Sequence, residues 1–178
     1  MVQKIEDFKI ESERIVLVPI SQEYKEVIFR EFTDEITLYM FPSTPKEISE
    51  TEEFIRATLE KVQKKEEIVT VILKKENSEF LGCCGLHRID TKTPEIGIWL
   101  KKGAHGYKYG QEAIHALKDW ADKNIDYDYL IYPVVKENTA SRRVPESLGG
   151  ELVRSFEKAN QSGLVRGMVE YFIYSDKK

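Results

Sequence analysis

The sequence has few of the residues that build disulfide or metal scaffolds. Among 178 residues there are two cysteines, and they are adjacent at Cys83 and Cys84. Neighbouring residues on a strand point to opposite faces, so no disulfide is expected between them and both are expected as core thiols. The three histidines (His87, His105 and His115) lack the spacing of a zinc site, so no metal is expected.

Long apolar runs and a surplus of positive charge are also missing. No apolar run approaches the length of about 18 residues that a membrane span requires, and the stretch MVQKIEDFKIESER has no core of signal-peptide length. The formal net charge is −4, which argues against bulk attraction to nucleic acid or an anionic membrane. We therefore expect a cytoplasmic protein with no nucleic-acid partner and no membrane partner.

What the sequence does contain is an ordinary globular composition, with 41% apolar and 33% charged residues. The length suits one domain over residues 1–178. Strand-like runs and helix-like runs follow one another without a repeat or linker. The expected strands are 13–20, 68–75, 79–89, 95–102, 129–135, 151–159 and 164–175, and the expected helices are 21–32, 48–65, one that follows Gly110 and one from Asn138 to Gly149.

This order predicts an α+β, or mixed α/β, domain built on one mostly antiparallel sheet. Short polar connections join the three strand-like runs between 68 and 102, which favours a meander. The passage from 95–102 through a helix to 129–135 predicts a right-handed crossover between parallel strands. At the start of the long helix, Thr44-Pro45-Lys46-Glu47 predicts a capping box with Thr44 as the N-cap.

The loop Gly103–Gly110 lies between a predicted strand and a predicted helix. A helix N-terminus offers unpaired N–H groups and partial positive charge, so it can bind an anion. The glycines allow close approach to a ligand, and Lys102 and Lys108 could add charge. The alternative is an ordinary turn with solvated lysines. The loop matches neither the Walker pattern nor the G-x-G-x-x-G fingerprint, which argues against a nucleotide triphosphate enzyme.

Three motifs in order give the sequence a family resemblance. They are EIGIWL at Glu95–Leu100, then Gly106, Gly110 and Glu112-Ala113, and later the run from Asn138 to Gly149 with Ser141 and Arg143-Val144. Together they resemble the GNAT N-acetyltransferases, in particular the branch of ribosomal-protein N-terminal acetyltransferases. The resemblance extends over most of the chain and implies a central twisted sheet with one splayed parallel strand pair and flanking helices.

The resemblance implies that the cosubstrate is acetyl-CoA. Its pyrophosphate would lie on the loop His105–Gly110 and the following helix start, and its pantetheine arm would pair with the backbone of Ile98–Leu100. Strand 129–135 would then splay away, which suits Pro133 because proline lacks the N–H of a fully paired strand. The coenzyme-binding residues so implied are Ile98, Trp99, Leu100, His105, Gly106, Tyr107, Lys108, Tyr109, Gly110, Gln111 and Asn138.

The implied reaction is direct attack of a primary amine on the thioester in a ternary complex. Glu95 is the candidate general base, directly or through a water, and the alternative is a solvated carboxylate or a structural partner of Arg88. Ser141 is the candidate donor to the leaving thiolate, with Tyr132 in reserve, and the alternative is a hydroxyl bonded within its own helix turn. His87 could face the acceptor cleft, although a lone strand histidine is more often structural.

The sequence departs from the family pattern at four positions. His105 replaces Gln or Arg, Lys108 replaces a glycine, Gln111 replaces a threonine, and Pro145 falls inside the last predicted helix. Lys108 is unsuited to a positive φ, and Pro145 predicts a kinked or short helix. These departures leave a second hypothesis open, a non-catalytic acyl-CoA-binding or sensing module.

The acceptor is not identified by the sequence. An amine-bearing partner, either a protein N-terminus or a small molecule, is what the resemblance implies. The hairpin at residues 151–175 offers a strand edge for a possible homodimer.

Overall fold

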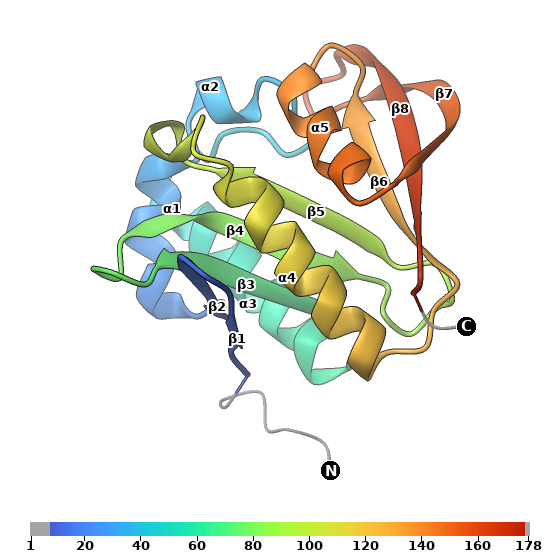
Figure 1. The fold of residues 1–178 in the computed structure, drawn as a ribbon. Helices are drawn as coiled ribbons and strands as arrows, with labels where there is room; N and C mark the ends of the chain where they lie inside the picture. The colour runs from blue at the N-terminus through green and yellow to red at the C-terminus, as the bar shows by residue number, and fades with distance from the viewer. Residues whose placement is uncertain (1–7, 177–178) are drawn as a thin grey trace.

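The computed structural model describes residues 8–176, which are arranged around one twisted sheet (Figure 1). The strands are β1 (Ile10–Glu11), β2 (Ile15–Pro19), β3 (Glu67–Lys74), β4 (Phe80–His87), β5 (Glu95–Leu100), β6 (Tyr129–Val135), β7 (Glu151–Ala159) and β8 (Val165–Tyr174). The helices are α1 (Lys25–Glu31), α2 (Asp34–Thr37), α3 (Ile48–Gln63), α4 (Tyr109–Asn124) and α5 (Thr139–Ser147), with 3₁₀ turns at Gln22–Tyr24 and Lys102–Ala104.

The eight strands lie in the order β1-β2-β3-β4-β5-β6-β8-β7. All neighbours are antiparallel except β5 and β6, which are parallel and share a single register pair, Glu95 with Ile131. Pro133 lies on β6 beyond that pair, where no strand hydrogen bond to β5 would use its missing N–H. The expected mixed sheet with one splayed parallel pair is confirmed.

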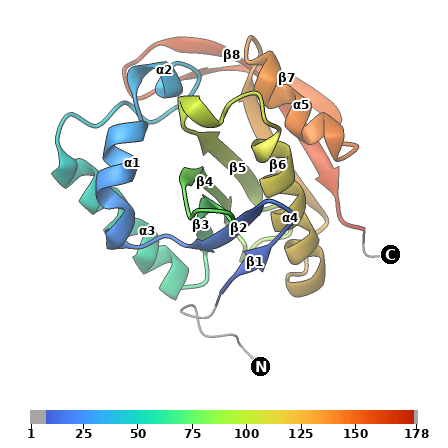
Figure 2. The same cartoon turned by 60° about the vertical axis from the view of Figure 1, so that its left-hand side comes forward.

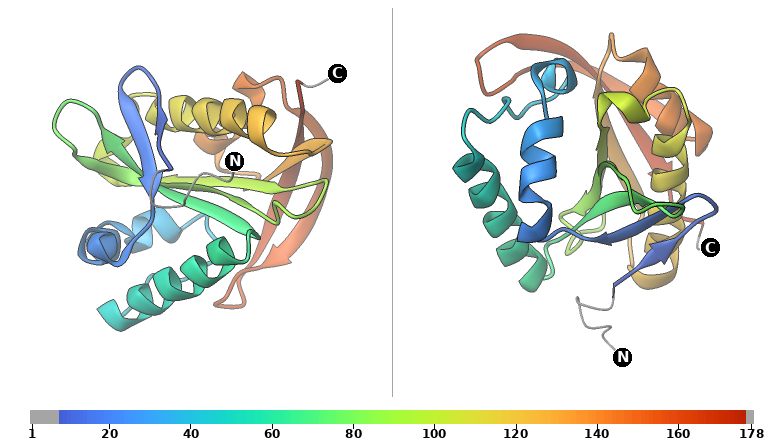
Figure 3. Two further views of the ribbon diagram at one scale, coloured as in Figure 1. Left: turned by 90° about the horizontal axis from the view of Figure 1, so that it is seen from below. Right: turned by 90° about the vertical axis from the view of Figure 1, so that its left-hand side faces the viewer.

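Helices cover both faces of the sheet, as Figures 2 and 3 show. Helices α4 and α5 pack on one face, over a core that includes Cys84, Ile96 and Leu130. Helices α1 and α3 lie on the other face, over a second core that includes Cys83. The adjacent cysteines are therefore buried on opposite faces and are both free thiols, as expected.

The start of α3 differs from the expectation. The N-cap is Glu47 rather than Thr44, and the N3 residue Glu50 completes the capping box. Glu50 Oε1 accepts hydrogen bonds from the backbone N–H of Lys46 at 2.8 Å and of Glu47 at 3.1 Å. The Thr44 hydroxyl lies instead 2.7 Å from the hydroxyl of Thr37.

Helix α5 is short, as Pro145 predicts. Its nine residues begin after Asn138, whose side chain caps the helix by accepting from Ser141 N. The carbonyl of Pro145 accepts from Leu148 N at 3.0 Å and from Gly150 N at 2.8 Å, which closes the C-terminus. Gly149 follows with φ +69°, a conformation that favours glycine at a helix end.

Candidate active site

The parallel strands β5 and β6 meet at one end and separate at the other (Figure 1). Their meeting point is Glu95 with Ile131, where Ile131 N also donates to Pro94 O at 2.8 Å. Among the described residues, β5 has no further register pair with β6, while its other edge pairs with β4 as far as Leu100. The edge of Ile98–Leu100 that faces β6 is therefore not paired with a strand.

The side chains along this edge point into the two cores and leave the backbone to face the gap. A Cβ placed on Gly110 would lie 3.4 Å from Leu100 Cδ1 and 3.7 Å from Ile98 Cδ1, so both side chains lie under the start of α4. Trp99 points the other way and packs edge-on against Phe32, with ring centroids 4.8 Å apart. These three positions can meet a ligand mainly through their main chain.

The loop before α4 has the backbone of an anion site. Gly106 has φ +85°, and Lys108, the N-cap of α4, has φ 64° and ψ 14°. The expectation that Lys108 is unsuited to a positive φ is wrong, because Lys108 adopts this conformation. The left-handed region costs a non-glycine residue about 1–2 kcal/mol. Lys108 makes no ion pair with any residue between 8 and 176, and the first amides of α4 follow it directly at this end of the gap.

We expect Lys108→Gly to have opposite effects on stability and on coenzyme affinity. Glycine relieves the left-handed strain, and we expect the free energy of unfolding to rise by about 1 kcal/mol. Loss of the ammonium removes charge from the proposed phosphate site, so KM for acetyl-CoA should rise about tenfold at low salt. Thermal unfolding and initial rates measure the two effects. An unchanged KM would show that the side chain does not meet the coenzyme.

Other side chains of the loop are held by protein contacts. His105 Nε2 lies 3.0 Å from the Leu100 carbonyl oxygen, and Gln111 Nε2 donates to Arg143 O at 3.3 Å. Tyr109 is buried, with the Arg14 guanidinium 4.7 Å from its ring centroid, and Tyr107 is exposed. Lys102, expected to add charge to the loop, is paired with Glu35, and the neighbouring Lys101 is paired with Glu79.

Glu112, in the first turn of α4, faces the β1–β2 connection. Its carboxylate accepts from the Ser12 hydroxyl, from Arg14 N at 2.7 Å and from Arg14 Nε at 2.8 Å. Burial alone would raise the pKa of Glu112, but these hydrogen bonds outweigh it and lower the pKa. The carboxylate thus holds the N-terminal strands against α4.

We expect Glu112→Gln to reduce the dependence of stability on acidic pH. Because the folded-state pKa of Glu112 is lowered, its contribution is complete above the unfolded value near 4.5 and is lost as pH falls through the folded value. Thermal unfolding between pH 7 and pH 3 measures this. The wild type should lose more stability than the variant on acidification, and equal losses would contradict the assignment.

Ser141 and Tyr132 form a hydroxyl pair between α5 and β6. Their oxygens lie 2.8 Å apart, and the backbone N–H of Ser141 donates to Asn138 Oδ1 at 3.2 Å. Burial raises the pKa of Tyr132 to about 12, so its hydroxyl stays protonated at neutral pH. Ser141 Oγ is thus bonded across to β6 rather than within its own helix turn.

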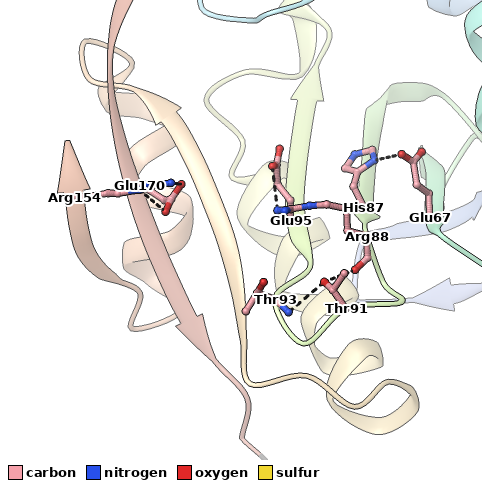
Figure 4. Close-up of polar contacts among 8 residues, drawn as sticks. All are labelled: Glu67, His87, Arg88, Thr91, Thr93, Glu95, Arg154 and Glu170. Carbon is pink, nitrogen blue, oxygen red and sulfur yellow. Dashed lines mark hydrogen bonds and ion pairs between the residues drawn. The ribbon is translucent and has the colours of Figure 1, made fainter. Parts of the chain in front are cut away.

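Glu95 lies at the meeting point of β5 and β6, on the face opposite α4. Its neighbour Ile96 is buried in the core under α4, so alternation along the strand places Glu95 on the other side. Glu95 Oε2 lies 3.7 Å from Arg88 Nη2, and both side chains are about half exposed (Figure 4). The carboxylate therefore has a cationic partner and remains open to solvent.

Two carboxylates on the same face were not singled out from the sequence. Glu67 Oε1 lies 3.2 Å from His87 Nδ1, and Glu170 accepts from Arg154 Nε at 2.9 Å and Nη2 at 3.0 Å (Figure 4). The sequence marked His87 as a residue that could face the acceptor cleft. Its partner Glu67 depends on strand register, which no local pattern reveals.

The described residues 8–176 contain no group of three or more His, Cys, Asp or Glu side chains suited to a metal ion. Within the same range, no helix combines the length and apolar character needed to cross a membrane.

Comparison with known proteins identifies the family. Residues 14–151 match the model of the acetyltransferase (GNAT) domain, and the chain therefore belongs to the GNAT acetyltransferase family. Among curated proteins it is similar to an uncharacterized N-acetyltransferase, p20, of Bacillus licheniformis. The two are 27% identical over 154 residues, which cover 83% of this chain and 86% of the relative.

Solved structures show the same fold at low sequence identity. The ribosomal L7/L12 alpha-N-protein acetyltransferase RimL in complex with coenzyme A superposes with a TM-score of 0.86 at 16% identity, covering 96% of this chain and 100% of that one. Spermidine N-acetyltransferase from Vibrio cholerae, in complex with coenzyme A and spermine, superposes with a TM-score of 0.80 at 15% identity, covering 93% and 98%. The expected GNAT fold is confirmed.

Proposed function

We propose that this protein transfers the acetyl group of acetyl-CoA to a primary amine. The observation that carries the proposal is the gap between β5 and β6, which is open along Ile98–Leu100 and ends at the loop before α4. The open edge suits an extended amide-bearing arm, and the loop suits a pyrophosphate. The family and the coenzyme A bound to both structural neighbours support this ligand.

The geometry of the two ends orients the coenzyme in this proposal. Its pyrophosphate lies on the amides between Gly106 and Gln111, near Lys108. Its pantetheine arm runs along β5 toward the meeting point of the strands, because the gap narrows there. The thioester then lies beside Glu95 on β5 and near Ser141 at the start of α5.

The chemistry follows from these positions. An ammonium group with a pKa of about 8 to 10 must lose a proton before its nitrogen can attack. Glu95 takes this proton, directly or through one water, and the nitrogen bonds to the thioester carbonyl carbon. The carbon–sulfur bond then breaks, and the thiolate is stabilised by the hydroxyl hydrogen of Ser141, which Tyr132 orients.

The acceptor is a protein N-terminus or a small amine. The two structural neighbours are described as acting on a ribosomal protein and as binding spermine, so the fold serves both kinds. On the candidate acceptor face, Glu95 is paired with Arg88 and Glu170 with Arg154. Because these carboxylates are already paired, we favour an acceptor with one positive charge over a polycation. A cytoplasmic location and a homodimer through the β7 edge stay predictions.

The proposal is tested by release of the coenzyme thiol from acetyl-CoA against peptides with free N-termini, polyamines and amino acids. We expect turnover with at least one monoamine and a marked loss of rate for Glu95→Ala. Tight coenzyme binding without turnover on any amine would favour the binding module, and undetectable binding would overturn both. If Glu95→Ala keeps full activity across pH, another group is the base.

A further inference from the structure

Three side chains form a row across β3, β4 and β5. Glu67 is the register partner of His87, and His87 is the register partner of Glu95. Register partners on neighbouring antiparallel strands have Cβ atoms about 5 Å apart and lie on the same face. Figure 4 shows the imidazole of His87 between the two carboxylates.

The contact with Glu67 fixes one side of this imidazole. Glu67 Oε1 lies 3.2 Å from His87 Nδ1 and accepts from Lys61 Nζ at 2.9 Å, and only 11% of the Glu67 side chain is exposed. Burial would raise the pKa of Glu67, but these two partners outweigh it and lower the pKa, so the group remains a carboxylate. A carboxylate at Nδ1 keeps a proton there and directs the lone pair of neutral imidazole to Nε2.

The row ends where the proposed thioester lies. Glu95 is the first residue of β5 and forms its single described register pair with β6, and two residues further along the same face Gly97 has no atom within 4 Å of an added Cβ. Open space therefore adjoins Glu95 on this face. The His87 side chain is 39% exposed, and none of the residues 8–176 forms a hydrogen bond or ion pair with its Nε2.

We propose that His87 Nε2 is the terminal acceptor for the proton of the amine, with Glu67 as the residue that positions it. This rests on the proposed function. The ammonium proton passes to a Glu95 carboxylate oxygen and from there through water to His87 Nε2, and the imidazolium releases it to solvent. An imidazole is intrinsically a stronger base than a carboxylate, so proton transfer in this direction is favourable.

The charged groups around His87 determine how the reaction's pH profile should respond to substitution. They are Glu67 on β3, Lys61 on α3, which bonds Glu67, Arg88 next along the chain, and Glu95 on β5. Removing the negative charge of Glu67 disfavours the imidazolium, so the pH profile of the reaction should move to lower pH. A merely structural pair would not move the pH profile of the reaction.

The experiment is the pH profile of kcat/KM between pH 5 and 9 for the wild type, His87→Gln and Glu67→Gln, with acetyl-CoA affinity and thermal unfolding measured for each. In the wild type we expect kcat/KM to rise with pH. In His87→Gln we expect a rate about 100-fold lower without this rise, and in Glu67→Gln we expect the rise at lower pH. His115→Gln is the matched control, since His115 lies on α4 beside Ser147, and it should keep the wild-type profile.

Each outcome supports or overturns the proton relay or the proposed function. A wild-type pH profile in His87→Gln would overturn the relay but not the proposed transferase activity. The same holds if the rising part of the Glu67→Gln profile lies at the wild-type pH. If His87→Gln does not fold, the Glu67→Gln shift alone decides. If the wild type turns over no amine, the proposed function itself is overturned. Measurable acetyl-CoA affinity would then favour the binding module, and no affinity would exclude both hypotheses.

Discussion

Ser141→Ala is expected to lower kcat about 100-fold and to leave acetyl-CoA affinity nearly unchanged. The serine hydroxyl lies 2.8 Å from the Tyr132 hydroxyl, at the start of α5 and beside the proposed thioester. A donor that acts only as negative charge develops on sulfur stabilises the transition state and not the bound substrate. The effect should therefore appear in kcat, measured by thiol release at saturating acetyl-CoA and amine.

Two further variants define what this result means. Ser147→Ala removes a hydroxyl at the far end of the same helix, where it bonds His115 and the Val144 carbonyl, and should keep the wild-type rate. Tyr132→Phe removes only the partner of Ser141, and we expect a loss of about tenfold. A Ser141→Ala variant with normal kcat would remove the serine from the reaction and leave its bond to Tyr132 as structural.

Gly82→Ala is expected to give the largest loss of stability of any single change discussed here. A Cβ at Gly82 would lie 2.1 Å from Trp99 O and 2.8 Å from Leu100 Cα. Both are backbone atoms of β5, so the clash cannot be relieved by a side-chain rotation and the strand must move. We expect a loss of about 3 kcal/mol or more, and a fall in Tm of about 6–12 °C.

The matched control lies on the neighbouring strand. Gly97→Ala adds the same methyl group to β5, but nothing lies within 4 Å of it, so stability should change by less than about 0.5 kcal/mol. Because β5 is the strand proposed to hold the pantetheine arm, Gly82→Ala should also weaken acetyl-CoA binding. Equal Tm values for the two variants would contradict the placement of β4 against β5.

Much of the fold follows from local chemistry in the sequence. The strand expected at 129–135 has the observed bounds of β6, and the hairpin around Asn160–Gly163 joins β7 and β8 as expected. Asn138 caps α5 because an Asn three residues before Ser141 can accept from its backbone N–H. These features depend on residues that are close along the chain, so the sequence alone predicts them.

The rest depends on competition and on long-range register. Thr44 and Glu47 are both followed three residues later by a glutamate, but Glu47 is the cap in the folded chain and Thr44 contacts Thr37 at the end of α2. Lys108 adopts a left-handed conformation that the residue itself disfavours, because the loop requires it at the start of α4. The row that joins Glu67 to His87 comes from β3–β4 register, which is set by the whole sheet.

The most direct test of the central claim is a crystal structure of the protein with acetyl-CoA bound. We predict the pyrophosphate against the amides from Gly106 to Gln111, the pantetheine arm along Ile98–Leu100 in the gap between β5 and β6, and the thioester between Glu95 and Ser141. Coenzyme bound elsewhere, for example in the surface groove that residues 9–14 form with α4, or a gap closed by full pairing of β5 with β6, would contradict the account.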